Sequence, residues 1–253
     1  MRALLLITAF SIAAAAADRA TLLDQASNPK LNSAQRNDAC FALRGDSTAA
    51  AKARMLELLA DEALRACAAR NLQQIAATAE LATAASHAQP DVRAVAIDAL
   101  GRLQDPAQIP LLINAARDPN AMVSMSGLQA LALLDQPEAL NALLQLAHTS
   151  DTVGLMALEA ALRFRSPRVL VRARELLAIN EIPARLAALR VIGELGDPSD
   201  LTALKALAPQ DEEMTAGPRG FGLMPPISIA RLARTAMTRI EARSSAASSV
   251  TGR

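Results

Sequence analysis

Apolar residues along most of the chain recur at the spacing of one face of an α-helix. Residues 89–103 place apolar side chains three or four positions apart, which is the period of an amphipathic helix. Pro106 ends this helix, because proline lacks an amide donor and restricts the residue before it. A second helix is predicted over 107–116, with Pro110 in its first turn, where a missing donor costs little. The pattern therefore predicts a unit of two helices joined by a tight turn.

This two-helix unit recurs with a period of 30 or 31 residues. Turn prolines mark four successive units: Pro106, Pro137, Pro167 and Pro198. Small residues share one register and would let the first helices of neighbouring units approach closely: Ala96, Gly127, Ala157 and Ala188. A helix pair cannot bury its apolar face alone, so neighbouring pairs must stack and share a core. The sequence predicts an all-α fold, an α-solenoid of about six to seven stacked antiparallel helix pairs.

The repeats carry a family likeness. Residues 90–106 begin Pro-Asp-Val-Arg and end Asp-Pro, and residues 183–198 begin Pro-Ala-Arg-Leu and end Gly-Asp-Pro. Over residues 89–209 the chain resembles HEAT-repeat proteins, especially the short repeats of phycobilisome-lyase-type HEAT-like proteins. The resemblance implies an α-solenoid and, in most members of the family, protein–protein interaction. It brings no catalytic residues to this chain, because the repeat is a structural device.

Composition shifts divide the chain into segments of different expected roles. In order these are a signal peptide (1–17), an N-terminal arm or cap (18–32), degenerate helical repeats (33–88), four regular HEAT-like repeats (89–209), a loop rich in Gly and Pro (210–226), a C-terminal capping helix (227–243) and a disordered tail (244–253). The tail is expected to be disordered because it consists mainly of Ser and Ala and lies at a terminus.

The first 17 residues have the pattern of a secretory signal. Arg2 supplies a positive start, an apolar run follows from Ala3 to Ala13, and Ala15 and Ala17 form a small-residue cleavage site. A buried N-terminal helix and an uncleaved membrane anchor are the alternatives. We expect cleavage after Ala17, a periplasmic or secreted protein, and no stable membrane insertion after cleavage.

Cys40 and Cys67 are the only cysteines, and they lie 27 residues apart in segments that both read as helix. An even number of cysteines in an exported protein favours one disulfide. The alternative is two small, buried, free cysteines, because free cysteine behaves as an apolar residue. Both interpretations remain open at the level of sequence.

Charge and aromatic content exclude several classes of partner. The chain has 26 Lys and Arg against 25 Asp and Glu, a net charge of +1, and loss of Arg2 with the signal would leave 25 of each. Trp and Tyr are absent and Phe occurs four times. Nucleic acid is therefore a poor partner, since a balanced chain without stacking residues lacks both means of binding it.

Catalytic and metal-binding patterns are missing from the sequence. His87 and His148 lie 61 residues apart, about two repeat periods, and neither stands in a zinc-ligand spacing. There is no Gly-x-Ser-x-Gly elbow and no phosphate-binding Gly-x-x-x-x-Gly-Lys loop. We therefore expect no enzyme activity, no cofactor and no metal. The alternatives are a lyase-type enzyme or accessory subunit, as the family likeness suggests, and a structural envelope protein.

We expect this chain to be a monomer. Two of its surfaces are candidates for binding a partner protein or peptide of acidic or mixed charge. The first is the concave ridge of second helices, with these exposed polar residues by register: Asn114, Gln145, His148, Arg168, Arg172, Glu175 and Lys205. The second is the loop 210–226, where Phe221, Leu223 and Met224 either form a recognition element or fold back as a cap. For the ridge, the alternative is an ordinary solvated helix face.

Overall fold

The computed structural model describes residues 18–149, 151–209, 213–214 and 227–251. Residues 18–27 are helical. Seven labelled α-helices of the described chain follow up to residue 134: α2 (Ser33–Ala42), α3 (Ala49–Leu58), α4 (Arg65–Gln74), α5 (Thr78–Ala84), α6 (Pro90–Leu103), α7 (Ile109–Ala116) and α8 (Ala121–Leu133). After residue 134 the α-helices are α9 (Pro137–Leu146), α10 (Thr152–Ala161), α11 (Pro167–Leu177), α12 (Ile182–Leu195), α13 (Leu201–Leu207) and α14 (Ile229–Thr251).

Short elements complete the described chain. Single turns of 3-10 helix occur at the start of second helices or the end of a first helix: η1 (Pro106–Gln108), η2 (Leu162–Phe164) and η3 (Pro198–Asp200). Strands β1 (Glu213–Met214) and β2 (Ile227–Ser228) form a two-residue antiparallel pair. The predicted all-α solenoid of HEAT/armadillo-like type is confirmed, with this strand pair as a minor addition. Among the described residues, no helix has the length and apolar character needed to cross a membrane.

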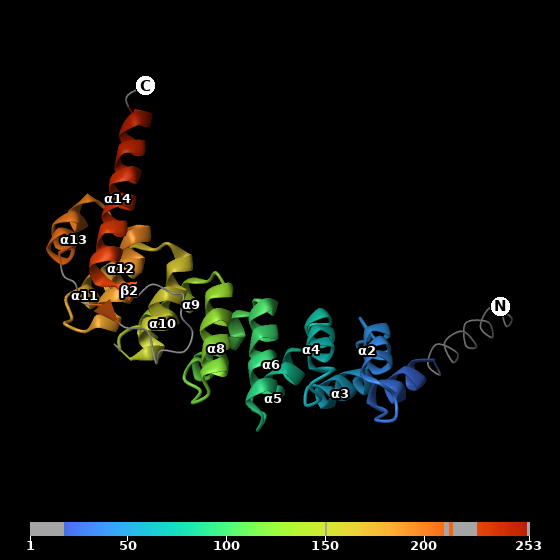
Figure 1. The fold of residues 1–253 in the computed structure, drawn as a ribbon. Coiled ribbons are helices and arrows are strands. Elements are labelled where there is room, and N and C mark those ends of the chain that lie inside the picture. Colours follow the sequence, from blue (N-terminus) through green and yellow to red (C-terminus); the bar gives the residue numbers. More distant parts are fainter. Residues whose placement is uncertain (1–17, 150, 210–212, 215–226, 252–253) are drawn as a thin grey trace. The chain divides into compact units, whose positions relative to one another are not determined.

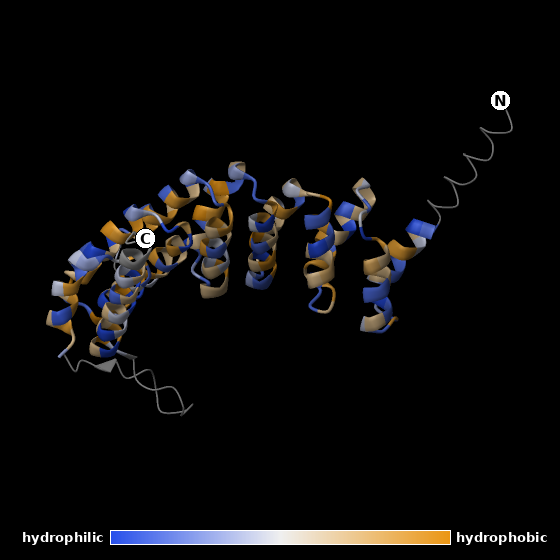
Figure 2. Cartoon of the chain, turned by 90° about the horizontal axis from the view of Figure 1, so that it is seen from above, coloured by the Kyte–Doolittle hydropathy of each residue, from blue (hydrophilic) through white to orange (hydrophobic). Residues whose placement is uncertain are grey.

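The chain divides into two compact units, Met1–Leu134 and Asp135–Arg253. In the first unit, helices α2 to α8 follow one another in sequence order, from blue to green in Figure 1, and α6 packs against α4, α5 and α8. In the second unit, α12 packs against α10, α11 and α14. Most helices combine hydrophobic and hydrophilic positions (Figure 2), as expected where one face is buried.

Helix ends are set by residues that satisfy free backbone groups. Asn32 accepts from the amide of Gln35, whose side chain in turn accepts from the amide of Asn32, which forms a capping box before α2. Asn120 accepts from the amides of Met122 and Val123 at the start of α8. Prolines occupy the first turns of α6, α9, α11 and α12, where proline needs no donor.

The predicted column of small residues lies in the core. Ala96, Ala157 and Ala188 are fully buried. A Cβ at Gly127 would clash with the backbone of Ala115 and Ala116, so only glycine allows α8 to approach α7 this closely. The column is therefore buried in both units, and at Gly127 the close neighbour is the second helix α7 rather than the neighbouring first helix that the sequence predicts.

Arginines near the start of first helices connect successive helix pairs in the first unit. Arg93 of α6 donates from Nη1 to the carbonyls of His87 (2.9 Å) and Ala88 (3.0 Å), beyond the end of α5. Its Nε and Nη2 bind the two carboxylate oxygens of Asp118, which precedes α8, at 2.9 and 3.0 Å. Two further arginines make the same two kinds of contact: Arg36 with the Ala26 carbonyl and Asp61, and Arg65 with the Leu59 carbonyl and Asp91. We call these three sets of contacts the arginine clamps.

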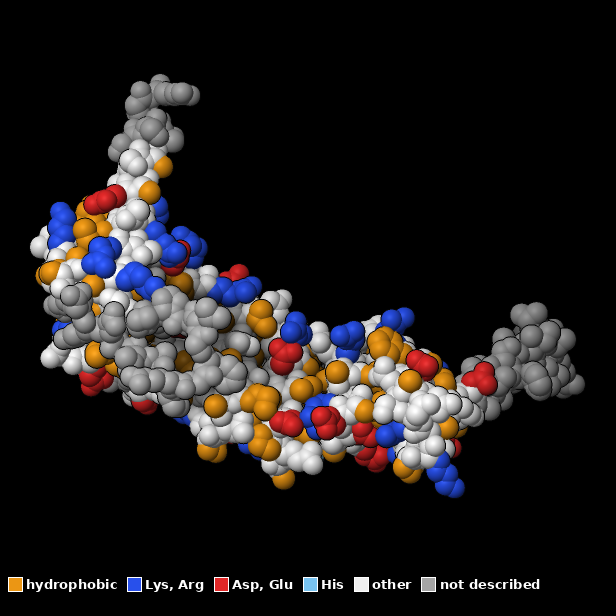
Figure 3. Space-filling view, viewed as in Figure 1, with side chains coloured by type: hydrophobic (Ala, Val, Ile, Leu, Met, Phe, Trp, Pro, Cys, Tyr) orange, Lys and Arg blue, Asp and Glu red, His pale blue; other side chains and the backbone are white. Residues whose placement is uncertain are grey.

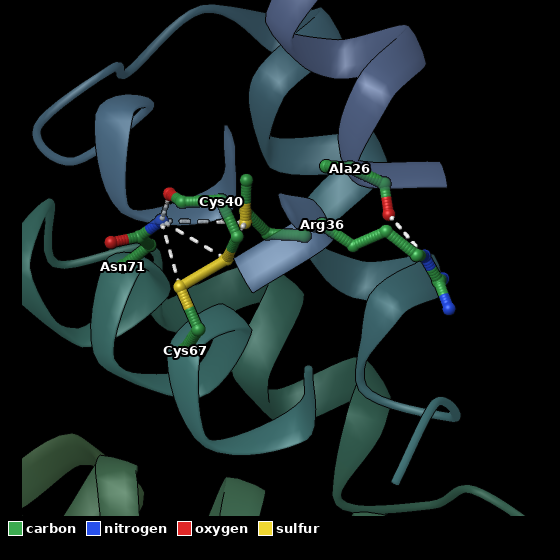
Figure 4. Close-up of a disulfide and its surroundings, with 6 residues drawn as sticks. Ala26, Arg36, Cys40, Cys67 and Asn71 are labelled. Atoms are coloured by element: carbon green, nitrogen blue, oxygen red, sulfur yellow. Dashed lines mark hydrogen bonds between the residues drawn. A yellow bond between two sulfur atoms is a disulfide. The ribbon is translucent and has the colours of Figure 1, made fainter. Parts of the chain in front are cut away.

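The predicted disulfide between Cys40 and Cys67 is present and joins α2 to α4 (Figure 4). Their Cα atoms are 6.4 Å apart, within the range that a disulfide accommodates. Both cysteines are buried. The buried Asn71 side chain lies beside the sulfurs and donates to the Cys40 carbonyl at 2.8 Å, which satisfies a backbone group in the core.

The prediction of a disordered tail over 244–253 is wrong for most of its length, because α14 continues to Thr251. Serine and alanine are compatible with a helix when the serine hydroxyls find acceptors. Ser244 donates to the Ile240 carbonyl at 3.0 Å and Ser245 to the Ala242 carbonyl at 3.0 Å. The predicted signal peptide, and Phe221, Leu223 and Met224 of the loop, lie outside the described residues.

Candidate binding groove

Helix α11 turns a mixed polar and apolar face to solvent in the second unit. Its inward positions are buried: Val169, Leu170, Ala173 and Leu176. Its outward positions follow at the i, i+3, i+4, i+7 spacing of one helix face: Arg168, Val171, Arg172 and Glu175. Between residues 163 and 174 the sequence has five arginines and no acid. On the outward face of α11 itself, two arginines and one glutamate surround one exposed aliphatic residue.

A shallow groove of about 240 Å³ lies between this face and the end of α9. It is lined by Leu144, His148, Arg168, Val171, Arg172 and Glu175, and we call these six residues the α9–α11 groove. Val171 is 53% exposed, the largest exposed fraction among the large hydrophobic residues of the described chain that are classed as exposed. The groove thus combines two aliphatic side chains with charged and polar ones.

Arg172 holds the two helices of the groove in place. Its Nε donates to the Ala147 carbonyl at 2.7 Å and its Nη2 to the His148 carbonyl at 3.0 Å. These are carbonyls at the C-terminal end of α9, where the helix dipole favours a positive charge. Its Nη1 binds Glu175 at 2.8 Å. Arg172 therefore has a structural role, and the acid that lines the groove is already paired.

Arg168 differs from Arg172 in having a neutral partner. Its Nη1 donates to the Asn141 side chain at 2.6 Å, and the described residues place no carboxylate within ion-pair distance of it. A guanidinium carries five N–H donors, so four have no hydrogen-bond partner among the described residues. The His148 imidazole is exposed and makes no hydrogen bond to the rest of the described chain. The groove accordingly has more free donors than free acceptors.

Arg174 faces another way and joins α11 to the next repeat. Its Nε and Nη2 bind Asp200 at 2.7 and 3.0 Å, and Nη2 also contacts Asp197 at 2.9 Å. The hydrogen bonds with Asp200, followed by those with Asp197, raise the pKa of Arg174. The pKa of Asp197 is lowered by hydrogen bonds from the Ser199 side chain and amide, and then by Arg174. This network fixes α11 without contributing to the groove.

The structure brings together four of the residues predicted for the second-helix ridge, His148, Arg168, Arg172 and Glu175. Asn114 on α7, Gln145 on α9 and Lys205 on α13 are exposed but do not line this groove. The sequence pattern did not distinguish Leu144 and Val171 from residues of the apolar core, so neither was predicted to line a binding surface. The i, i+3 spacing from Arg168 was a signal that could have placed Val171 outside.

The polar side chains of the groove are suited to non-covalent contacts. Within the described ranges, no three His, Cys, Asp or Glu residues come together as a possible metal site. His148 is the one histidine that lines the groove. Its other polar groups are two guanidinium groups and one paired carboxylate, a set suited to recognising a charged side chain.

The fold and the groove define a helical-repeat protein of the HEAT/armadillo-like class. The family model for HEAT repeats matches residues 78–163, which cover α5 to α10 and the start of η2. Residues 78–163 are thus similar to HEAT repeats. A comparison with proteins of curated function found no match.

Three of the solved structures that match this chain are as follows. A structure of Kap95p with RanGDP is 16% identical, with a TM-score of 0.55 over 88% of this chain, and the chain spans about a third (33%) of Kap95p. Human deoxyhypusine hydroxylase in complex with glycerol is 18% identical over 88% of this chain and 96% of its own, with a TM-score of 0.39. A designed armadillo repeat protein in complex with the peptide (KR)4 is 14% identical over 87% and 98%, with a TM-score of 0.45. Of these three, the Kap95p structure has a TM-score above 0.5, and at 16% identity that likeness concerns the fold alone.

Proposed function

We propose that the protein is a non-catalytic interaction scaffold that binds a protein or peptide in the α9–α11 groove. The observation that carries this proposal is Val171, an aliphatic side chain 53% exposed beside the free donors of Arg168. In protein contact surfaces an apolar centre is covered while a polar rim stays in contact with solvent, and the groove has this arrangement on a small scale. The 30–31-residue period also leads us to assign the repeats to the short, phycobilisome-lyase-type group, without transferring lyase chemistry.

A rigid surface favours this role. Arg172 fixes α11 to the end of α9, and Arg174 fixes α11 to the turn before α13. A partner would therefore meet side chains whose backbone is already ordered, and binding would require little further loss of conformational freedom. A scaffold of this kind can function without a reaction.

The charge and surface of the chain favour a protein over a nucleic acid as the partner. On the face shown in Figure 3, basic and acidic side chains are interspersed with small hydrophobic patches. The whole chain has a net charge of only +1. Nucleic-acid binding depends on many phosphate contacts from a basic surface, and these features provide few of them. We further propose that the protein acts as a monomer.

We also propose that the protein is exported to the periplasm or beyond the cell. The buried Cys40–Cys67 disulfide supports this, because disulfides persist mainly in oxidising compartments. The signal-like residues 1–17 support it independently. Mass analysis of the protein from fractionated cells tests both: a chain that begins at Asp18, found in the envelope or medium with its disulfide intact, is the expected result. A full-length, reduced chain in the cytoplasmic fraction would refute export.

Site-specific photo-crosslinking in the cells that produce the protein tests the binding face. A benzoylphenylalanine at position 171 should give a discrete crosslinked product with another protein. The matched control is the same group at position 122, because Met122 is a similarly exposed apolar residue (47%) in the first unit. Equal products from both positions, or a product from position 122 alone, would contradict the assignment of the groove.

A further inference from the structure

We infer that the α9–α11 groove binds an extended peptide segment in which an acidic residue and an aliphatic residue are two positions apart. The inference rests on the proposed function and specifies the chemistry of the partner. Three properties of the groove lead to it: its unbalanced charge, its size, and the spacing of Arg168 and Val171 along α11.

The charge of the groove calls for a carboxylate. Arg168 and Arg172 are the cations that line it, and Glu175 is the acid. Glu175 is already bound by Arg172 at 2.8 Å, whereas Arg168 contacts the neutral amide of Asn141. A ligand carboxylate would give Arg168 a charged acceptor and could take two parallel hydrogen bonds from its guanidinium. A basic ligand would instead have to approach two guanidinium groups.

The apolar part of the groove fits one aliphatic side chain. Leu144 and Val171 provide its apolar contacts, and the groove is about 240 Å³. Sites for drug-sized ligands and cofactors usually have volumes of about 300–1,000 Å³. This groove is smaller and open to solvent, so it suits a short stretch of a larger chain. A Leu, Ile or Val side chain would cover Val171 and remove its exposed surface from water.

The positions of Arg168 and Val171 on α11 are matched by one spacing of residues in an extended ligand. Arg168 and Val171 are three residues apart on α11, so their Cβ atoms lie about 5–6 Å from each other. In an extended peptide, side chains on the same face belong to residues i and i+2, separated by about 6.6 Å. Neighbouring residues point to opposite faces. An acid and an aliphatic residue at i and i+2 can therefore contact Arg168 and Val171 together.

Fluorescence anisotropy with labelled octapeptides and the full chain tests the inference. The probe carries Glu-Ser-Leu in a Gly/Ser background. The comparison peptides carry Gln-Ser-Leu, Lys-Ser-Leu, or Glu-Leu without the spacer. We expect the Glu-Ser-Leu peptide to bind about tenfold more tightly than the Gln or Lys peptides, and its affinity to fall as salt is raised. The unspaced peptide should bind more weakly than the spaced one.

Variants of the groove separate the two contacts. Arg168→Gln should remove the preference for Glu over Gln, and Val171→Ser should weaken all peptides that contain Leu. The control is Arg117→Gln, which removes the same charge at an exposed position of the first unit and should leave binding unchanged. Circular dichroism of each variant establishes that it is folded before binding is measured.

The outcomes distinguish this inference from the proposed function. Equal or tighter binding of the Gln or Lys peptide overturns the inference. If no peptide binds while position 171 still crosslinks to a protein, the acidic segment is the wrong ligand and the scaffold proposal stands. If the peptide preference holds but position 171 gives no crosslink in cells, the chemistry of the groove is supported and the proposed function is not.

Discussion

Replacing Arg93 by methionine should destabilise the first unit far more than replacing a similar arginine on its surface. Arg93 makes two hydrogen bonds to the carbonyls of His87 and Ala88 and a two-point ion pair with Asp118. The side chains of Arg93 and Asp118 are only 16% and 14% exposed. Methionine preserves much of the apolar stem but removes every donor, which leaves the Asp118 carboxylate without its cation.

The expected cost can be bounded from known magnitudes. Breaking a buried ion pair on one side costs about 3–5 kcal/mol, and a pair that keeps some solvent contact costs less, so we expect Arg93→Met to lower the free energy of unfolding by about 2–3 kcal/mol. The matched control is Arg102→Met. Arg102 also forms a two-point pair, with Asp98 at i−4, but these side chains are 55% and 45% exposed. Its loss should cost about 0.5 kcal/mol or less.

The effect of Arg93→Met should depend on pH. The hydrogen bond from the Arg93 side chain is the largest cause that lowers the pKa of Asp118, with the Asn120 amide contributing further. A carboxyl group with a lowered pKa stabilises the fold above its unfolded value, about 3.9, and loses this contribution as the pH falls through the folded value. The difference between wild type and Arg93→Met should therefore be largest near pH 7 and shrink below about pH 4.

Urea denaturation followed by circular dichroism, at pH 7 and at pH 3, measures these differences. Because a repeat protein can unfold in parts, hydrogen exchange of amides in α6 and α8 should accompany it. Equal destabilisation by Arg93→Met and Arg102→Met would refute the reasoning, as would a difference that stays constant with pH. Equal destabilisation would mean that burial does not make the Arg93–Asp118 pair stronger than the exposed Arg102–Asp98 pair.

Two further predictions concern the packing of the repeats. Gly127→Ala should lower the free energy of unfolding by about 1–3 kcal/mol, because its Cβ would meet the backbone of Ala115 and Ala116, whereas Gly193→Ala, whose Cβ would lie 3.5 Å from Ala236, should be close to neutral in the same denaturation assay. The prediction is rejected if Gly193→Ala proves destabilised while Gly127→Ala is as stable as the wild type. Reduction of the Cys40–Cys67 disulfide should cost about 3 kcal/mol and increase hydrogen exchange in α2 and α4, and unchanged denaturation with and without a reductant would show that the bond contributes nothing.

Much of the fold could be predicted because residues close together in the sequence, chiefly the prolines and the spaced apolar residues, determine where each helix of a repeat begins and ends. Proline and apolar spacing placed the ends of helices such as α6 and α7 closely. The turn between α4 and α5 was not predicted, since it contains neither Gly nor Pro. There Ala76 adopts a left-handed conformation with φ of 50°, and the amide of Ala77 donates to the Leu72 carbonyl at 2.8 Å. Alanine seldom adopts this conformation, so its sequence gives no sign of it.

The candidate site was predictable only in part. Register alone placed Arg168, Arg172 and Glu175 on one exposed face, because i, i+4 and i+7 positions align on any helix. The helical register of the sequence could not show that the Arg172 guanidinium donates to carbonyls at the end of α9. Nor could it show that Arg168 keeps donors without a partner among the described residues. That distinction depends on tertiary contacts between residues about 25 positions apart. For the same reason, the arginine clamps were not predicted, although Arg36 and Asp61, and Arg93 and Asp118, recur at one separation of 25 residues.

The arginine clamps also bear on how such a chain can change in length during evolution. Each clamp joins one side chain to main-chain carbonyls before it and to an aspartate 25 or 26 residues after it. Duplication of one helix pair would copy both an arginine and an aspartate, and every copy would meet an equivalent partner in its neighbour. Deletion of one helix pair would likewise place the arginine of the preceding helix pair beside the aspartate of the following one. Whole repeats could thus be gained or lost without leaving a buried charge unpaired, whereas an insertion of a few residues within a repeat could not.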